Sequence, residues 1–194
     1  MDAHLWPRPR TDQELLTATL SGDEEAFVEI YRRHRDRVYR FACRMTGSAE
    51  LARDVTHTCF ASLLETPSRF DGRVGLGTYL CAAARNQSLR HAGRAWRERS
   101  AGSSPDLRPA SGPSPLEALL EDERARIVRE ALSALAPLHR EVLILVEYED
   151  LDLATVAEIV QAEVGAVKVR LHRARRKLRA ALEAHAKSAA LTVE

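Results

Sequence analysis

A segment rich in proline, serine and glycine interrupts the chain near its middle and divides what remains. Residues 101–115 read AGSSPDLRPASGPSP and carry four prolines but one leucine. Such a composition has too little apolar surface to offset the entropy lost on ordering, so it predicts a flexible linker about 20–23 Å long. We therefore expect two small domains in this chain of 194 residues, at 11–99 and 116–186, joined by a linker over 100–115.

Helix signals fill the first domain. Thr11 and Glu14 have the spacing of a capping box, and Asp23 and Ser48 can cap two further helices. Apolar side chains follow each cap at helical spacing, and no alternating strand pattern appears anywhere in the chain. The fold class that we predict is all-α. The aromatic side chains expected to pack in the core are Phe27, Tyr31, Phe41 and Phe60.

A loop is predicted between the third helix and the fourth. Residues 66–77 (TPSRFDGRVGLG) contain three glycines and follow the point at which Pro67 ends the third helix. Thr78 is expected to cap the fourth helix, which continues into a run of arginines that ends at Arg99. The loop and this basic helix are therefore neighbours in the predicted fold.

The second domain ends in the pattern of a helix-turn-helix. A helix is expected over residues 116–135, and Pro137 suits the first position of the next helix. Asp152 can cap a short helix, a turn follows near residues 161–163, and a long helix starts at Val164. Apolar residues recur every three or four positions along this long helix. Basic residues cover its other faces, as in a helix that reads the major groove of DNA.

The charges of the chain balance overall but are segregated. With 29 Lys and Arg against 28 Asp and Glu, the net charge is +1. Residues 25–99 hold 14 basic and 8 acidic side chains, residues 121–160 hold 4 and 10, and residues 161–187 hold 8 and 2. This segregation indicates a nucleic-acid partner. It also predicts that the basic helix after Arg85 folds back onto the acidic block through exposed, salt-sensitive charge pairs, which would mask DNA-binding surface.

Several functional classes find no support in the residues. No glycine-rich phosphate loop follows a strand and no Ser/His/Asp or paired-carboxylate set suggests catalysis, so we expect no enzyme activity, cofactor or metal site. Cys43, Cys59 and Cys81 are far apart and odd in number, which predicts buried thiols in a reducing cytosol. No apolar run approaches the roughly 20 residues of a membrane span, and residues 1–10 lack the core of a signal peptide. We expect a cytoplasmic protein without membrane insertion.

Three ordered groups of residues resemble those of one protein family. The groups are residues 23–31 (DEEAFVEIY), residues 52–60 with residues 79–86, and residues 135–143 with residues 165–175. With a linker before the third group, this order resembles the bacterial RNA polymerase sigma factors of the sigma-70 family, in the extracytoplasmic-function (ECF) group. The resemblance covers about residues 12–99 and 117–184.

The resemblance implies a task for each domain. Region 2, in the first domain, would bind the β′ clamp of core RNA polymerase and open the promoter −10 element. Region 4, in the second domain, would bind the β flap and read the −35 element. A separate anti-sigma factor is implied as a further partner. The implied core-polymerase contacts are Asp54, His57 and Thr58. The implied −10 contacts are Phe70, Asp71, Tyr79, Arg85, Asn86, Arg90 and Arg94. The implied −35 contacts are Lys168, Val169, Arg170, His172, Arg173 and Arg176.

The chain departs from the family pattern at a few of these positions. His57 and Thr58 stand where many members have Gln and Glu, so fewer acidic side chains are left to contact the clamp. Gln161 stands at the usual turn glycine and is expected to adopt a positive φ. Val169 replaces the usual serine, so promoter preference does not carry over from relatives.

Two other interpretations compete with the sigma factor. A stand-alone helix-turn-helix regulator would bind duplex DNA without polymerase, and its first domain would sense a ligand or dimerise. An adaptor built of helical bundles would bind proteins only. The helix that carries Arg and Asn beyond the loop at 66–77, together with the lack of a dimer heptad, favours the sigma factor.

Overall fold

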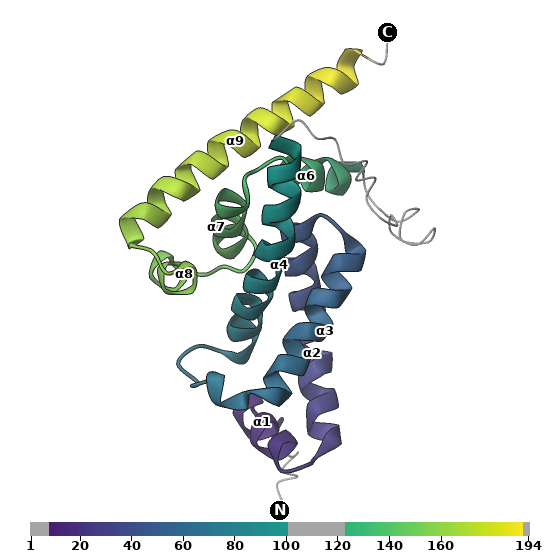
Figure 1. Ribbon diagram of the computed structural model, residues 1–194, viewed down its shortest axis with the longest axis vertical. Coiled ribbons are helices and arrows are strands. Elements are labelled where there is room, and N and C mark those ends of the chain that lie inside the picture. Colours follow the sequence, from purple (N-terminus) through teal and green to yellow (C-terminus); the bar gives the residue numbers. More distant parts are fainter. Residues whose placement is uncertain (1–7, 101–122, 192–194) are drawn as a thin grey trace, which may run out of the picture.

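The computed structural model describes residues 8–100 and 123–191, with side chains over 8–91 and 125–185. This part of the chain contains helices and no strands, which confirms the predicted all-α class (Figure 1). None of the described helices is both long enough and apolar enough to cross a bilayer. Most of the predicted linker, and residues 116–122, lie outside the described residues. The elements are α1 (Asp12–Leu20), α2 (Glu24–Thr46), α3 (Ala49–Glu65), a short 3₁₀ helix η1 (Pro67–Arg69), α4 (Leu76–Ser100), α6 (Glu123–Ser133), α7 (Pro137–Glu147), α8 (Leu153–Val160) and α9 (Val164–Leu191).

Local hydrogen bonds start four of the helices, α1, α2, α3 and α8, where the sequence predicts. The Glu14 backbone N–H donates to Thr11 Oγ1 at 3.2 Å, and the Thr11 N–H donates to Glu14 Oε2 at 2.8 Å, which completes the capping box. The side chains of Asp23, Ser48 and Asp152 cap α2, α3 and α8 in the same way. Each cap gives a partner to backbone N–H groups that the first turn of a helix leaves unpaired.

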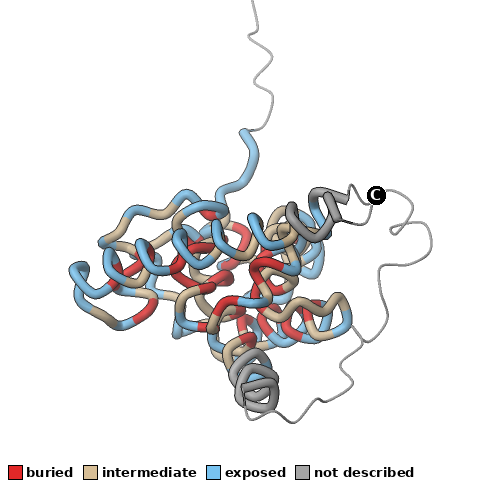
Figure 2. The backbone as a smooth tube through the Cα atoms, turned by 90° about the horizontal axis from the view of Figure 1, so that it is seen from above, coloured by how far each residue is buried: buried red, intermediate tan, exposed pale blue. Residues whose placement is uncertain are grey.

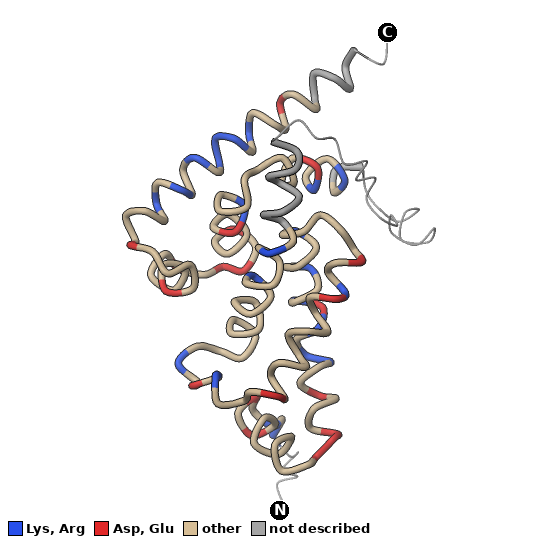
Figure 3. The backbone as a smooth tube through the Cα atoms, viewed as in Figure 1, with Lys and Arg blue, Asp and Glu red and all other residues tan. Residues whose placement is uncertain are grey.

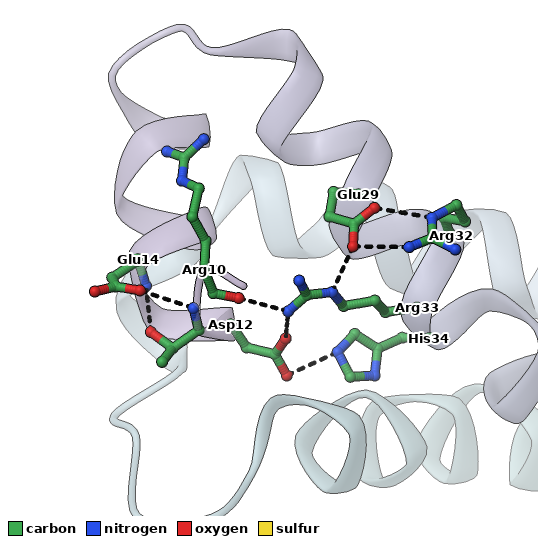
Figure 4. Close-up of polar contacts among 8 residues, drawn as sticks. Arg10, Asp12, Glu14, Glu29, Arg32, Arg33 and His34 are labelled. Atoms are coloured by element: carbon green, nitrogen blue, oxygen red, sulfur yellow. Dashed lines mark hydrogen bonds and ion pairs between the residues drawn. The ribbon is translucent and has the colours of Figure 1, made fainter. Parts of the chain in front are cut away.

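Helix α1 is held against α2 by charged side chains (Figure 4). Asp12 accepts a hydrogen bond from Arg33 at 3.2 Å and contacts His34 at 2.8 Å, so one carboxylate joins two successive residues of α2. Glu29 also accepts from Arg33, at 2.7 Å, and from Arg32. These two arginines hold the pKa of Glu29 well below its usual range, at about 2. Arg32 and Arg33 are therefore already paired with carboxylates within the first domain.

The start of α4 corrects one prediction. The helix begins at Leu76, so Thr78 lies inside its first turn rather than capping it, and η1 occupies part of the predicted loop. The reason is tertiary, because Leu76 is buried and Gly77 lies directly against α2. A Cβ added at Gly77 would lie 2.7 Å from Arg37 Nη1 and 3.1 Å from His34 Nδ1. Glycine thus allows a close approach between helices, where the sequence pattern indicates only a loop.

The core of the first domain forms where α2 packs against α1, α3 and α4. Phe41 and Phe60 are buried, and Tyr31 lies edge-on to Phe60 with ring centroids 4.8 Å apart, so the predicted core role of these aromatics is confirmed. Two of the three cysteines are buried in the same region, at positions 59 and 81, and burial raises the pKa of each thiol to about 12. Both thiols are therefore protonated at neutral pH and behave as small apolar side chains.

The two domains pack against each other through α6 and α7, which contact α2 (Figures 1 and 2). Val142 and Leu145 of α7 belong to one buried cluster with Val38 of α2 and Leu80 of α4. A continuous apolar core therefore joins the domains, and Figure 2 shows the buried residues, in red, gathered in the middle of the molecule. Burial of this kind is the main source of stability in a folded chain.

Buried charges cross this boundary between the domains. Arg85 Nε donates to Glu141 Oε2 at 2.6 Å, and Arg37 Nε donates to Glu149 Oε2 at 2.7 Å. The side chains of Glu141 and Glu149 are only 0% and 4% exposed. Arg85 thus meets the acidic block through a buried pair, whereas the prediction was of exposed pairs made by the helix that follows Arg85. Salt screens buried pairs far less than exposed ones, so this contact is not a salt-sensitive one.

Candidate nucleic-acid interfaces

The helix-turn-helix is built by two local signals and one apolar seam. Asp152 Oδ1 accepts from the backbone N–H groups of Ala154 and Thr155, both at 2.9 Å, and so starts α8. Gln161 ends α8 in the left-handed conformation with φ 53°, as predicted from its place at the usual turn glycine. Val167 of α9 is buried in the same apolar cluster as Val156 of α8. This seam fixes which side of α9 faces outward.

The outward side of α9 carries all six predicted −35 contacts. Five of them are exposed and Arg170 is half-buried. Within the described residues, Lys168, Arg173 and Arg176 form no ion pair, so their charges are available to an anion. Figure 3 shows basic residues following one another along α9. Arg175, by contrast, points back to α7, where its Nε donates to Glu147 Oε1 at 2.7 Å.

This concentration of charge affects one histidine that the sequence analysis did not single out. His139 of α7 is half-buried and has its pKa lowered by burial first, and then by Lys177, Arg173 and Arg170. The neutral imidazole therefore adds no positive charge beside α9 at neutral pH. The basic surface that α9 presents comes from its own Lys and Arg side chains.

The predicted −10 contacts fall into two groups, one at the loop before α4 and the start of that helix and one further along α4. Phe70, just after η1, lies edge-on to Tyr79 at a centroid distance of 5.2 Å, and both rings are half-buried. Asp71 beside them is exposed and binds Arg73 at 2.7 Å. Asn86 is exposed two helical turns beyond Tyr79, about 10 Å along the same face of α4. The structure thus aligns the two groups on one side of the first domain without joining them in one pocket.

The remaining predicted −10 contacts are basic residues of α4. Arg90 is exposed four residues beyond Asn86, and the side chain of Arg94 lies outside the described residues. Arg85 points into the boundary with α7, as its bond to Glu141 requires, and its Nη1 donates to Asn86 Oδ1 at 2.9 Å. In this arrangement Arg85 is not on the exposed face, which differs from the expected DNA-contact position.

The predicted polymerase contacts share an exposed face of α3. Asp54, His57 and Thr58 are all exposed, and their spacing of three and four residues places them together. The Thr58 hydroxyl donates to the backbone carbonyl of Asp54 at 2.8 Å, so it is engaged within the helix. His57 lines a hollow of about 370 Å³ with Tyr31 and Arg53. Among the described residues, Asp54 forms no ion pair and presents a free carboxylate.

The sequence analysis assigned no role to two charged residues at the domain boundary. Arg140 is 1% exposed, and its guanidinium donates to the carbonyl of Met45 in the first domain and to those of Ser133 and Leu135. Glu141 is buried beside it, and burial raises the pKa of this carboxyl although Arg85 opposes the change. Both stand directly before the run VLILV at residues 142–146, which is apolar all round. Such a run indicates a buried helix, and it is the sequence signal that points to burial of the two charged residues beside it.

Comparison with known proteins gives consistent matches for both domains. The chain matches the Sigma-70 region 2 family over residues 30–98 and the Sigma-70 region 4 family over residues 125–178. It is 28% identical to the ECF RNA polymerase sigma factor SigE of Mycolicibacterium smegmatis, over 95% of this chain and 74% of that protein. It is 26% identical to the ECF RNA polymerase sigma factor SigW of Bacillus subtilis, over 81% of this chain and 89% of that protein.

Solved structures share the fold at low sequence identity. The sigma factor RpoE of Bartonella quintana, in complex with the anti-sigma factor NepR, superposes with a TM-score of 0.65 at 20% identity, covering 81% of this chain and 96% of that one. CnrH, in complex with the cytosolic domain of CnrY, gives a TM-score of 0.61 at 22% identity, with coverages of 89% and 97%. Both likenesses concern the arrangement of helices.

Proposed function

This chain belongs to the ECF sigma factors of the sigma-70 family, which direct RNA polymerase to promoters, and on that premise we propose how its two domains divide the task. The exposed basic face of α9 carries the proposal furthest, because Lys168, Arg173 and Arg176 form no ion pair among the described residues and the α8–α9 seam holds them outward. Region 4, at 116–186, reads the −35 element with this face and binds the β flap. Region 2, at 11–99, binds the β′ clamp and opens the −10 element. The protein acts in the cytoplasm, without catalysis of its own.

The alternative of a stand-alone regulator is not favoured. A protein that binds duplex DNA without polymerase has no need of region 2, yet the region 2 family matches residues 30–98. The exposed carboxylate of Asp54 on α3 is also more suited to a basic protein surface than to DNA.

Substitutions on α9 test the −35 assignment. Arg173→Ala should cost about 1–3 kcal/mol of promoter binding at particular base pairs, because a guanidinium fork can bond two acceptors of one guanine. Arg176→Ala should weaken binding to all promoters by a similar factor if it contacts phosphate. The measurement is transcription by the reconstituted holoenzyme from a set of −35 variants. Arg175→Ala is the control, because that guanidinium is bound to Glu147. Wild-type transcription by both test variants would remove α9 as the reading helix.

A charge reversal on α3 tests the polymerase contact. Asp54→Arg should weaken binding to core polymerase about tenfold, because it places a repulsive charge where an acidic residue is proposed to meet the clamp. Core affinity and melting temperature are measured together, with Glu25→Arg as an equal change of charge at an exposed position of α2. A fall in melting temperature without a fall in core affinity would assign Asp54 to the helical bundle instead.

The remaining −10 assignment is tied to the packing of the domains. We place Phe70, Asp71 and Tyr79 at the opened strand because aromatic rings beside a polar loop can stack an unpaired base. Asn86, Arg90 and Arg94 contact the opened DNA strand along α4. His57 and Thr58 belong to the separate clamp contact, which they complete together with Asp54. Arg85 joins them only when it leaves Glu141, since one guanidinium cannot serve both partners from a buried position. The packed state therefore withholds part of region 2 from DNA.

A protein inhibitor is the further partner that we propose. The structures of RpoE and CnrH that share this fold are complexes with NepR, an anti-sigma factor, and with the cytosolic domain of CnrY. A partner that holds the two domains together would keep Arg85 and the boundary covered. This function needs no enzyme activity from either protein.

A further inference from the structure

Val169 places an apolar side chain in the middle of the outward basic face of α9. It is 50% exposed and, in the described part of the chain, belongs to neither of the buried apolar clusters. Lys168 precedes it, and Arg173 lies about one turn further along the same side of the helix; both are exposed. The apolar surface of Val169 therefore contributes little to the folding of the domain and is available to whatever α9 binds.

The buried seam of α9 fixes the direction in which Val169 points. Val167 and Leu171 are 0% and 6% exposed and belong to the same apolar cluster as Val156 of α8. Val169 lies two residues from each of them, which is about 160° around the helix axis from both, so it points away from the seam. It also lies within the first two turns of α9, which begins at Val164. That part of a recognition helix is the part that contacts base edges in the major groove.

A valine side chain can read only one feature of the major groove. The base edges there present hydrogen-bond donors, hydrogen-bond acceptors and, on thymine, the C5-methyl group. Against a donor or an acceptor, valine would displace water without replacing its hydrogen bond, which costs free energy. The thymine methyl group has no hydrogen bond to lose and offers apolar surface to bury. Contact with it is therefore the favourable one for a side chain of this kind.

We propose that Val169 makes this protein select a thymine in the −35 element, through contact between the valine methyl groups and the C5-methyl group of that base. The side chain is branched at Cβ, so a single χ1 rotamer dominates in a helix and little entropy is lost on contact. Arg173 follows four residues later, about 6 Å along the helix axis. Successive base pairs are about 3.4 Å apart, so the thymine lies within about two base pairs of the base that Arg173 contacts. The inference rests on the proposed function in one respect, namely that α9 reads the −35 element.

Selection from promoter DNA that is randomised across the −35 element locates the thymine. Core polymerase is reconstituted with the full wild-type chain or with Val169→Ser, and the duplexes that each holoenzyme binds are sequenced. Serine can bond donors and acceptors alike, so it has no reason to prefer the methyl group. The wild type should enrich thymine at one position, and Val169→Ser should lose that preference while the neighbouring positions keep theirs. Because Val169 is exposed, the melting temperatures of the two proteins should agree.

Replacing the selected thymine with deoxyuridine then tests the methyl group itself. This change removes the C5-methyl group and leaves every hydrogen-bonding group of the base in place. Fluorescence anisotropy of a labelled promoter should show that wild-type holoenzyme binds the deoxyuridine duplex about three- to fivefold more weakly, the effect of one buried methyl group. Val169→Ser should bind both duplexes equally. Val28→Ser, which changes a valine of α2 that is 62% exposed, is the matched control and should keep the wild-type response.

Three results would overturn the proposal. The first is a selected −35 sequence that is the same for the wild type and for Val169→Ser. The second is equal wild-type affinity for the thymine and deoxyuridine duplexes, which would place Val169 against the sugar-phosphate backbone. The third is a loss on deoxyuridine that persists in Val169→Ser, which would assign the methyl contact to another side chain or to the stiffness of the DNA.

Arg173→Ala separates these failures from failure of the proposed function. If Arg173→Ala changes the selected −35 sequence and Val169→Ser does not, α9 reads the element and Val169 takes no part in the reading. If neither variant changes the selected sequence, α9 is not the reading helix, and the proposed function of that helix falls together with the role of Val169.

Discussion

Replacing Arg140 with alanine should lower the free energy of unfolding by about 3–5 kcal/mol, among the largest losses that we expect from a single substitution. The guanidinium donates to carbonyls of Met45, Ser133 and Leu135 and is 1% exposed. Alanine would leave these three carbonyls without the donor, in a place that water does not reach. Because Met45 belongs to region 2, the loss should fall on the packing of the domains as well as on region 4.

Chemical denaturation of the full chain measures the effect. Arg32→Ala is the matched control, since the Arg32 side chain is 71% exposed and its surface pair with Glu29 should contribute little to stability. Arg140→Lys keeps the charge but not the planar fork, so it should recover only part of the loss. If the free energy of unfolding of Arg140→Ala lies within about 1 kcal/mol of the wild-type value, the three carbonyls find other partners and Arg140 does not join the domains.

Replacing Arg85 with alanine should separate the domains. The variant leaves the carboxylate of Glu141 buried without its cation, and breaking such a pair costs about 3–5 kcal/mol. Separation is the simplest way to hydrate Glu141, because its partner lies on the other domain. Small-angle scattering should therefore give a larger radius of gyration for Arg85→Ala than for the wild type. The wild-type radius should stay constant across a salt series, since the pairs at the boundary are buried.

The isosteric variant Glu141→Gln provides the matched comparison. It removes the charge that burial disfavours and keeps the shape, so it should destabilise the packed state less than Arg85→Ala does. Adding Glu141→Gln to Arg85→Ala should restore part of the compact form. An Arg85→Ala radius equal to that of the wild type, with the double variant unchanged as well, would show that the apolar core alone holds the domains together.

The pH dependence follows from the direction of the Glu141 shift. Burial raises the pKa of this carboxyl in the folded state, so the folded state binds the proton more tightly than the unfolded state does. The contribution of Glu141 to stability is therefore fully present below the unfolded pKa and is lost as the pH rises through the folded pKa. Without Arg85 the pKa should rise further. The loss in free energy of unfolding caused by Arg85→Ala should accordingly become smaller as the pH falls from 7 toward 5. Chemical denaturation at each pH measures it.

The all-α class, the capped starts of α1, α2, α3 and α8, and the outward face of α9 could be predicted from the sequence because the forces that determine them act over a few residues. Thr11 and Asp152 bond to backbone groups two or three residues away, so a short motif contains both partners. The left-handed Gln161 is a local property of the same kind. The seam of α9 follows from its helical period. These features need no knowledge of the rest of the chain.

Only the tertiary structure decided how residues far apart in the sequence meet. Gly77 lets α4 approach Arg37, and that approach moves the helix start ahead of Thr78. Arg85 has the charge and the sequence position of a DNA contact. Its side chain nevertheless points inward to Glu141, which lies 56 residues further along the sequence. Whether a cation faces DNA or a buried carboxylate depends on the free energy of desolvation at its final position. Packing between the domains determines that free energy, and no local pattern contains it.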